Sequence, residues 1–207
     1  MPFVALDWLK DHVEVVPGTD IKQLSYDLVK VGLEEEAIHP AAVIGPLVAG
    51  RVLTLDAKEQ SNGKVINYCR VDVGEFNDRP GEGKEPSELP SRGIICGAHN
   101  FKVGDLVVVS LPGAVLPGDF QIAARKTYGH VSDGMICSQR ELGIGDDHNG
   151  IIVLEQLLPE KAAAGELPAP GESVIELLGL GEETLEINIT PDRGYCFAMR
   201  GVGREYA

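Results

Sequence analysis

The side chains best suited to chemistry in this 207-residue sequence are mainly basic, aromatic and imidazole groups, with a few amides and a hydroxyl, between residues 51 and 132. Cationic groups neutralise phosphates and aromatic rings stack on bases, so such a set can bind a nucleic acid without any catalytic group. Arg125 and Lys126 form the densest positive charge in this region. The candidate contact residues are Arg51, Lys64, Asn67, Tyr68, Arg70, His99, Asn100, Lys102, Arg125, Lys126, Tyr128, His130 and Ser132.

Other kinds of site find little support. Ser132 and Ser138 lie near His130 in the sequence, but no third group is spaced to orient a base, which argues against a hydrolytic triad. The sequence has no phosphate-cradling P-loop and no dinucleotide-binding motif, and its five histidines are scattered. We therefore expect no catalytic residue, no metal site and no ATP site in this chain.

The segments that must position these groups are short runs rich in Val and Ile, separated by Gly, Pro, Asn or Asp. This pattern predicts an antiparallel barrel of short strands. The expected strands are residues 47–55, 65–73, 93–98, 105–111 and 120–126, closed by the apolar run 150–154. Residues 75–91 are rich in Pro, Gly and Glu and predict a long loop.

The flanking segments have a different pattern. Apolar residues at helical spacing predict helices over residues 5–12 and 21–31, the second capped by Thr19. Residues 33–38 and 184–189 are expected to be strands, and residues 196–206 a helix. That helix has no C-terminal cap before Ala207, so we expect the sequence to be part of a longer protein.

Composition limits the possible partners and compartments. The net charge is −14, so a nucleic acid would be bound weakly or with help from other parts of an assembly. The four cysteines show no close pair and follow no signal peptide, which predicts buried thiols in a cytoplasmic protein. No apolar run approaches the roughly 20 residues that a membrane helix needs.

Several ordered motifs resemble one family. Residues 96–100 read Cys-Gly-Ala-His-Asn, a Val-rich run ends in Leu-Pro-Gly-Ala at residues 111–114, and residues 132–138 read Ser-Asp-Gly-Met-Ile-Cys-Ser. Residues 190–193, Thr-Pro-Asp-Arg, continue the likeness. Together these motifs resemble the tRNA-binding, EMAP-like OB-fold domain of the bacterial phenylalanyl-tRNA synthetase beta subunit and the segments around it.

The resemblance implies an α+β fold in which an antiparallel OB-fold β-barrel is inserted into a small α/β domain formed by the N- and C-terminal segments. The domain boundaries it suggests are 1–40 for the first part of the small domain, 41–155 for the OB fold, 156–192 for the second part, and 193–207 for the start of a further domain. The loop between the first two strands departs from the family, because residues 57–65 lack its Pro-Ala-Asp-Lys-Leu signature. This departure argues against tRNA contact by that loop.

The resemblance also implies a function. The chain would be the non-catalytic N-terminal part of a phenylalanine–tRNA ligase beta subunit, and would help to bind or position tRNA. The parent complex would contain two alpha and two beta subunits and would use ATP and Mg²⁺. Two alternatives remain open: an OB module that binds protein without useful RNA affinity, and a free-standing tRNA-binding protein.

Overall fold

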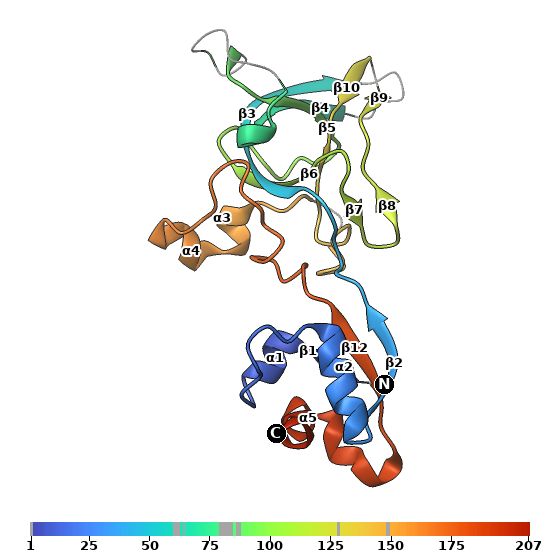
Figure 1. Ribbon diagram of the computed structural model, residues 1–207. Helices are drawn as coiled ribbons and strands as arrows, with labels where there is room; N and C mark the ends of the chain where they lie inside the picture. Colours follow the sequence, from blue (N-terminus) through green and yellow to red (C-terminus); the bar gives the residue numbers. More distant parts are fainter. Residues whose placement is uncertain are drawn as a thin grey trace. The chain divides into compact units, whose positions relative to one another are not determined.

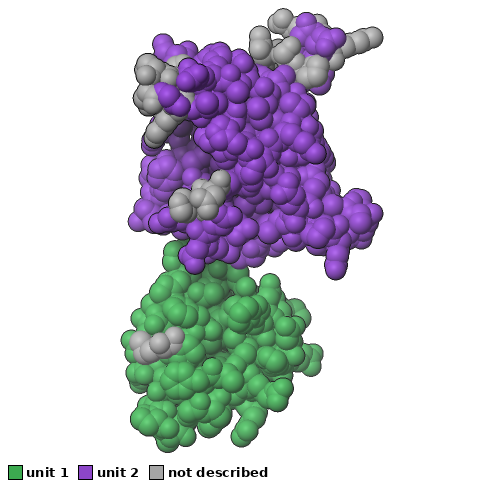
Figure 2. Space-filling model, turned by 180° about the vertical axis from the view of Figure 1, so that it is seen from behind, with its two compact units in different colours: residues 1–42, 181–207 green, residues 43–180 purple. Residues whose placement is uncertain are grey.

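The computed structural model describes residues 2–59, 63, 65–78, 85, 88–127, 129–147 and 150–207. The chain divides into two compact units, shown in different colours in Figure 2. Unit 1 contains residues 1–42 and 181–207, and unit 2 contains residues 43–180. Unit 2 is therefore inserted in the sequence between two segments that fold together, as predicted.

Unit 2 is built on a five-stranded antiparallel sheet that curls into a nearly closed OB-like barrel (Figure 1). Its strands are β3 (Leu47–Glu59), β4 (Val65–Asp72), β5 (Arg92–Cys96), β6 (Leu106–Ser110) and β11 (Met135–Ile136), in the order β11-β6-β3-β4-β5.

The length of β3 explains how this sheet curls. Residues Leu47–Arg51 pair with β6 and residues Arg51–Glu59 pair with β4, with a bulge between Val52 and Thr54. One strand thus belongs to both sides of the barrel, and the bulge increases its bend. The two edges of the sheet meet where the Asp133 N–H donates to the Gly93 carbonyl at 2.8 Å.

Strand β6 contributes residues to two hydrophobic cores, one on each of its faces. All five of its residues are buried. Val107 and Val109 belong to the cluster inside the barrel, whereas Leu106 and Val108 belong to a second cluster on the outside. Successive side chains of a strand point to opposite faces, so the outer apolar face of β6 must also be covered.

The covering of this outer face moves a predicted domain boundary. Helix α3 (Leu154–Leu157) contributes Leu154 to the outer cluster, and the segment after α4 (Pro159–Ala164) contributes Val174 and Leu180. Residues 156–180 consequently belong to unit 2, whereas the sequence-based division placed residues 156–192 in the small domain. The uninterrupted apolar run of β6, Leu106 to Val109, is the signal that a second layer is needed there.

Unit 1 is a three-stranded antiparallel sheet covered by short helices. The order is β1 (Phe3–Ala5), β12 (Thr184–Asn188), β2 (Glu34–His39). The helices are α1 (Leu6–Lys10), α2 (Ile21–Lys30), the 3-10 segment η3 (Pro191–Phe197) and α5 (Met199–Tyr206). Cys196 and Val202 share one core with Leu185 of β12, and residues 193–207 belong to unit 1.

The cap of α2 is one residue later than predicted. Asp20, not Thr19, is the N-cap, and its side chain accepts a hydrogen bond from the Gln23 N–H at 2.8 Å. The Thr19 hydroxyl instead donates to the Val16 carbonyl, in the turn before the helix. Both side chains can cap a helix, so the choice depended on the turn, which a sequence pattern does not specify.

The four cysteines are buried, and all four are free thiols. Burial raises the pKa of Cys69 and of Cys137 to about 12 and that of Cys96 to about 11. These thiols pack as small apolar groups, as predicted. Within the part of the chain that the structure describes, no helix is both long enough and apolar enough to span a membrane.

Candidate nucleic-acid interface

The outer face of β4 and β5 carries the first group of candidate residues. Tyr68 pairs with Ile95 and Arg70 pairs with Gly93, whereas the intervening Cys69 lies in the barrel core. Because side chains alternate along a strand, Tyr68, Arg70 and Ile95 point away from the core. This is the face formed by the second and third strands, which OB folds commonly use for oligonucleotides.

Gly93 allows the two long side chains of β4 to lie across β5. A Cβ atom at this position would be 2.4 Å from the Tyr68 hydroxyl oxygen and 3.0 Å from Arg70 Nη1. Any side chain at residue 93 would therefore displace Tyr68 or Arg70. The glycine shapes the face on which these residues are presented.

Tyr68 forms an aromatic platform with His130 of β10 (His130–Ser132). Their rings are stacked, with centroids 4.3 Å apart and planes inclined by 25°. Lys58 Nζ lies 3.0 Å from His130 Nε2. An ammonium group only donates, so Nε2 accepts and this tautomer carries its proton on Nδ1. A cation and two stacked rings thus come together from three separate strands.

Strand β9 (Arg125–Thr127) pairs with β10 as a hairpin, and its register separates two candidates that are adjacent in sequence. Arg125 lies opposite Ser132 and Thr127 opposite His130, whereas Lys126 lies opposite Val131. Paired residues share a face, so Arg125 is on the His130 side and Lys126 is on the other. Among the described residues, neither cation has an acidic partner within ion-pair distance.

Two other candidate arginines are held by the protein itself. Arg51 Nη1 lies 2.8 Å from Glu155 Oε1 and donates to the Gly104 carbonyl at 2.7 Å. Arg70 donates to the carbonyl and hydroxyl oxygens of Ser91, at 2.8 and 3.0 Å. Both guanidinium groups stabilise loops of the barrel, and only Arg70 does so on the face that carries Tyr68.

The Cys-Gly-Ala-His-Asn motif, residues 96–100, helps to close the barrel through Asn100. Asn100 donates from Nδ2 to the Ile151 carbonyl (2.8 Å) and accepts at Oδ1 from the Ile151 N–H (2.9 Å). A side chain at Gly150 would collide with Asn100, because its Cβ would be 2.5 Å from Asn100 Nδ2. The buried Asn67 amide nitrogen lies 3.2 Å from His99 Nδ1 and donates to the Ala98 carbonyl.

The remaining candidates are placed as follows. The backbone N–H of Lys102 donates to Asp105 Oδ2 at 2.9 Å, and Lys102 is exposed. Lys64 and Tyr128 lie outside the described residues. Four residues that lie on or beside the outer face of β4 and β5 were not predicted from the sequence: Lys58, Ile95, Phe120 and Thr127. The signal for Phe120 was its aromatic character in the same run as Arg125.

A shallow hollow of about 210 Å³ adjoins this face. It lies between β5, β8 (Phe120–Gln121) and the β9–β10 hairpin. Its lining combines apolar, hydroxyl and cationic groups, contributed by Ile95, Phe120, Gln121, Ile122, Ala123, Arg125, Thr127, Ser132, Gly134 and Met135.

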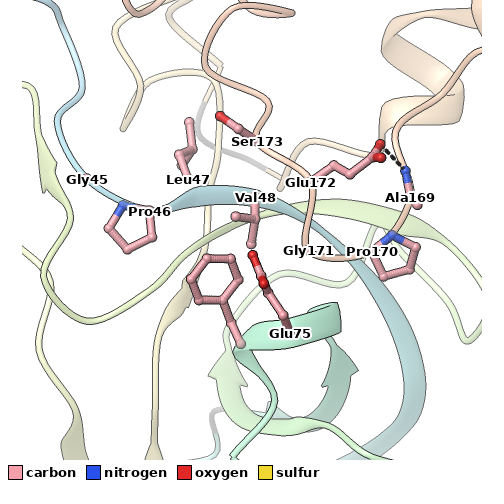
Figure 3. A pocket seen from close by; sticks show the side chains of 11 residues that line it. Gly45, Pro46, Leu47, Val48, Glu75, Ala169, Pro170, Gly171, Glu172 and Ser173 are labelled. Atoms are coloured by element: carbon pink, nitrogen blue, oxygen red, sulfur yellow. Dashed lines mark hydrogen bonds between the residues drawn. The ribbon is translucent and has the colours of Figure 1, made fainter.

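A second, larger hollow of about 580 Å³ has a different chemistry (Figure 3). It lies between the start of β3, the 3-10 turn η1 (Gly74–Phe76) and residues 169–173. Its charged lining residues are Glu75 and Glu172, and the Glu172 carboxylate accepts a hydrogen bond from the Ala169 N–H at 2.8 Å. Carboxylates repel phosphates, so this hollow is not suited to a nucleic-acid backbone.

The serines near His130 have structural roles. Ser132 Oγ accepts from the Ile95 N–H at 3.0 Å and donates to the Gly134 carbonyl. Ser138 Oγ donates to Glu141 Oε2 at 2.8 Å. In the described part of the chain, no group of three or more His, Cys, Asp or Glu side chains is arranged to hold a metal ion.

Comparisons with known proteins agree with this geometry. Residues 47–163 match the family described as "Putative tRNA binding domain". The chain is 56% identical over 207 residues to a phenylalanine–tRNA ligase beta subunit of Bifidobacterium longum (strain NCC 2705), covering all of this chain and 23% of that protein. It is 49% identical over 208 residues to the same subunit of Thermobifida fusca (strain YX), covering 99% of this chain and 22% of that protein.

The chain thus spans a little under a quarter of the length of these relatives. The match covers both the barrel and its flanks, which confirms the resemblance that the sequence motifs indicated. The chain therefore belongs to the tRNA-binding-domain family, and along its whole length it is similar to bacterial phenylalanine–tRNA ligase beta subunits.

Proposed function

We propose that this chain is a non-catalytic, tRNA-positioning part of a phenylalanine–tRNA ligase beta subunit. The observation that carries the proposal is the outer face of the barrel, where the Tyr68 and His130 rings stack and Lys58 contacts His130. Arg125 lies on the same side of the hairpin and has no acidic partner among the described residues. Stacked rings and cations are the two features that nucleic-acid surfaces need.

The proposed role is positioning because the chain's charge opposes strong independent binding. A net charge of −14 repels a phosphate backbone over the range that salt does not screen. The local cations would make a few contacts, while the alpha subunit and a second beta subunit of an α2β2 complex would supply the rest. Joining phenylalanine to tRNA with ATP and Mg²⁺ would take place in those other parts.

A second candidate function is a protein-interaction module without useful RNA affinity. The observation that favours it is that Arg51 and Arg70, two of the candidate cations, are already engaged by Glu155 and Ser91. The acidic hollow near Glu75 is also a surface that RNA would avoid.

A salt titration of tRNA binding to the full 207-residue chain distinguishes the two functions. If the proposal holds, binding weakens steeply with salt, and the double variant Arg125→Glu/Lys126→Glu loses about tenfold or more in affinity at low salt. Its salt slope should also fall by about one, because each phosphate contact contributes about one and only Arg125 of the pair lies on the side that carries His130.

The matched control is Lys22→Glu/Lys161→Glu, which makes the same change in net charge at exposed positions on α2 and α4. It should affect affinity much less than the hairpin variant. Equal losses would show that only net charge matters. No binding by the wild type, even at low salt, would favour the protein-interaction module.

A further inference from the structure

The hollow beside the hairpin has the composition of a site for one planar ring. The phenyl ring of Phe120 is 43% exposed, and the Arg125 guanidinium carbon lies 5.9 Å from its centroid. Ile95 and Met135 are apolar residues of its lining. An aromatic ring and a guanidinium plane are the two groups on which proteins stack unpaired bases.

Hydrogen-bonding capacity is available at the same place. Ser132 Oγ is used by Ile95 and Gly134, but the Thr127 hydroxyl and the Gln121 amide have no partner among the described residues. Both side chains line the hollow. A hydroxyl that can donate or accept, and an amide that can do both, can read the polar edge of a base.

The size of the hollow limits what can enter it. Its volume is about 210 Å³, below the range of about 300–1,000 Å³ found for drug-sized ligands. A single ring fits this description better than a whole nucleotide, whose phosphate would remain outside. In an A-form duplex the bases are stacked and paired, so only a base from a loop, bulge or strand end can be inserted.

We propose that the hollow between β5, β8 and the β9–β10 hairpin binds one unpaired base of a bound RNA, stacked against Phe120 and Arg125. This inference rests on the proposed tRNA-binding function and adds the structural class of RNA that the site selects. The chain should then bind single-stranded RNA more tightly than duplex RNA of equal length.

Neighbouring alanines offer a matched pair of variants to test this site. Ala123 and Ala124 are both exposed, but only Ala123 lines the hollow. Ala123→Phe should fill it without changing charge, and Ala124→Phe should leave it open. Phe120→Ala removes the stacking ring without filling the hollow, and thermal unfolding of each variant shows that it is folded.

The measurement is the affinity of the full chain for a 12-nucleotide single-stranded RNA, the matching duplex and a tRNA transcript. In wild type and Ala124→Phe, we expect the single strand to bind at least about fivefold more tightly than the duplex. Ala123→Phe and Phe120→Ala should abolish that preference, and binding should change the fluorescence of a 2-aminopurine base in the strand only in the wild type and Ala124→Phe.

Three results would overturn the inference. Equal wild-type affinity for single strand and duplex would contradict the selection of an unpaired base. Equal effects of Ala123→Phe and Ala124→Phe would show that the hollow is not the site. In either of these cases, tRNA binding that is still weakened by the Arg125→Glu/Lys126→Glu variant would leave the proposed function standing, and only the base site would fail. If no RNA binds the wild type, both the base site and the proposed function fail.

Discussion

Two segments of unit 2 both supply candidate RNA-contact residues in the sequence, but in the structure one closes the barrel and the other is exposed. Residues 97–100 and 125–132 each supply polar and basic candidates. In the first segment, Asn100 uses both ends of its amide to hold Ile151, and His99 contacts the buried Asn67. In the second, Arg125 and Lys126 point outward without an acidic partner in the described structure.

The difference shows that residue type does not decide between closing a barrel and binding a ligand. What decides is whether the backbone brings a partner to the side chain. Asn100 meets an extended segment with free N–H and C=O groups, whereas Arg125 lies on a short hairpin whose own backbone groups are paired. The first segment is thus expected to control stability and the second to control binding.

The largest predicted effect is a loss of folding stability at alkaline pH, caused by the buried Cys137 thiol. Burial raises the pKa of Cys137 from its ordinary value of 9.0 to about 12. The folded protein therefore keeps this proton between pH 9 and 12, while the unfolded chain releases it. The stability due to the protonated thiol is complete below pH 9 and falls by about 1.4 kcal/mol for each pH unit above it.

Urea unfolding of wild type and Cys137→Ala from pH 7 to pH 11 measures this effect. The stability difference between the two proteins should change by about 2–3 kcal/mol in favour of the variant from pH 7 to pH 11. A difference that does not depend on pH would mean that the thiol ionises inside the folded protein.

The next effect is on barrel closure. Asn100→Ala removes both hydrogen bonds to Ile151, so the free energy of unfolding should fall by about 1–3 kcal/mol. His99→Ala, a change at the adjacent exposed residue, should cost much less. Chemical denaturation gives both values, and a larger loss for His99→Ala would reverse the roles assigned to the two residues.

The smallest stability effect is expected on the binding face. His130→Ala removes the ring stacked on Tyr68, and we expect a loss of about 0.5–1.5 kcal/mol. Val131→Ala, whose side chain is 53% exposed on the other side of the same strand, is the control and should change little. If tRNA affinity is lowered by Val131→Ala rather than by His130→Ala, the ligand uses the opposite face of the hairpin.

Much of the fold could be predicted from the sequence because strand periodicity and turn residues are local signals. The β-barrel follows from such signals, whereas its insertion between the flanks was implied by the resemblance to one family, which rests on the ordered motifs of residues 96–100, 111–114 and 132–138. The extent of the barrel unit could not be predicted in the same way. Residues 156–180 join it only because both faces of β6 need to be covered, a requirement set by the tertiary arrangement.

The candidate site was predictable in part. Tyr68, Arg125 and His130 were selected as basic or aromatic residues, and the structure brings Tyr68 and His130 into contact. The opposite directions of Arg125 and Lys126 depend on strand register, which is fixed by pairing with β10. The closing role of Asn100 depends on Ile151, which is distant in sequence, so no local pattern could reveal it.

The most direct test of the contrast between the two segments is an NMR titration of the isotope-labelled chain with tRNA at low salt. We predict that the resonances of Tyr68, Ile95 and residues 125–132 shift or broaden first, while those of residues 97–100 and Ile151 remain unchanged. Perturbations centred on residues 97–100, with the hairpin unaffected, would contradict the account.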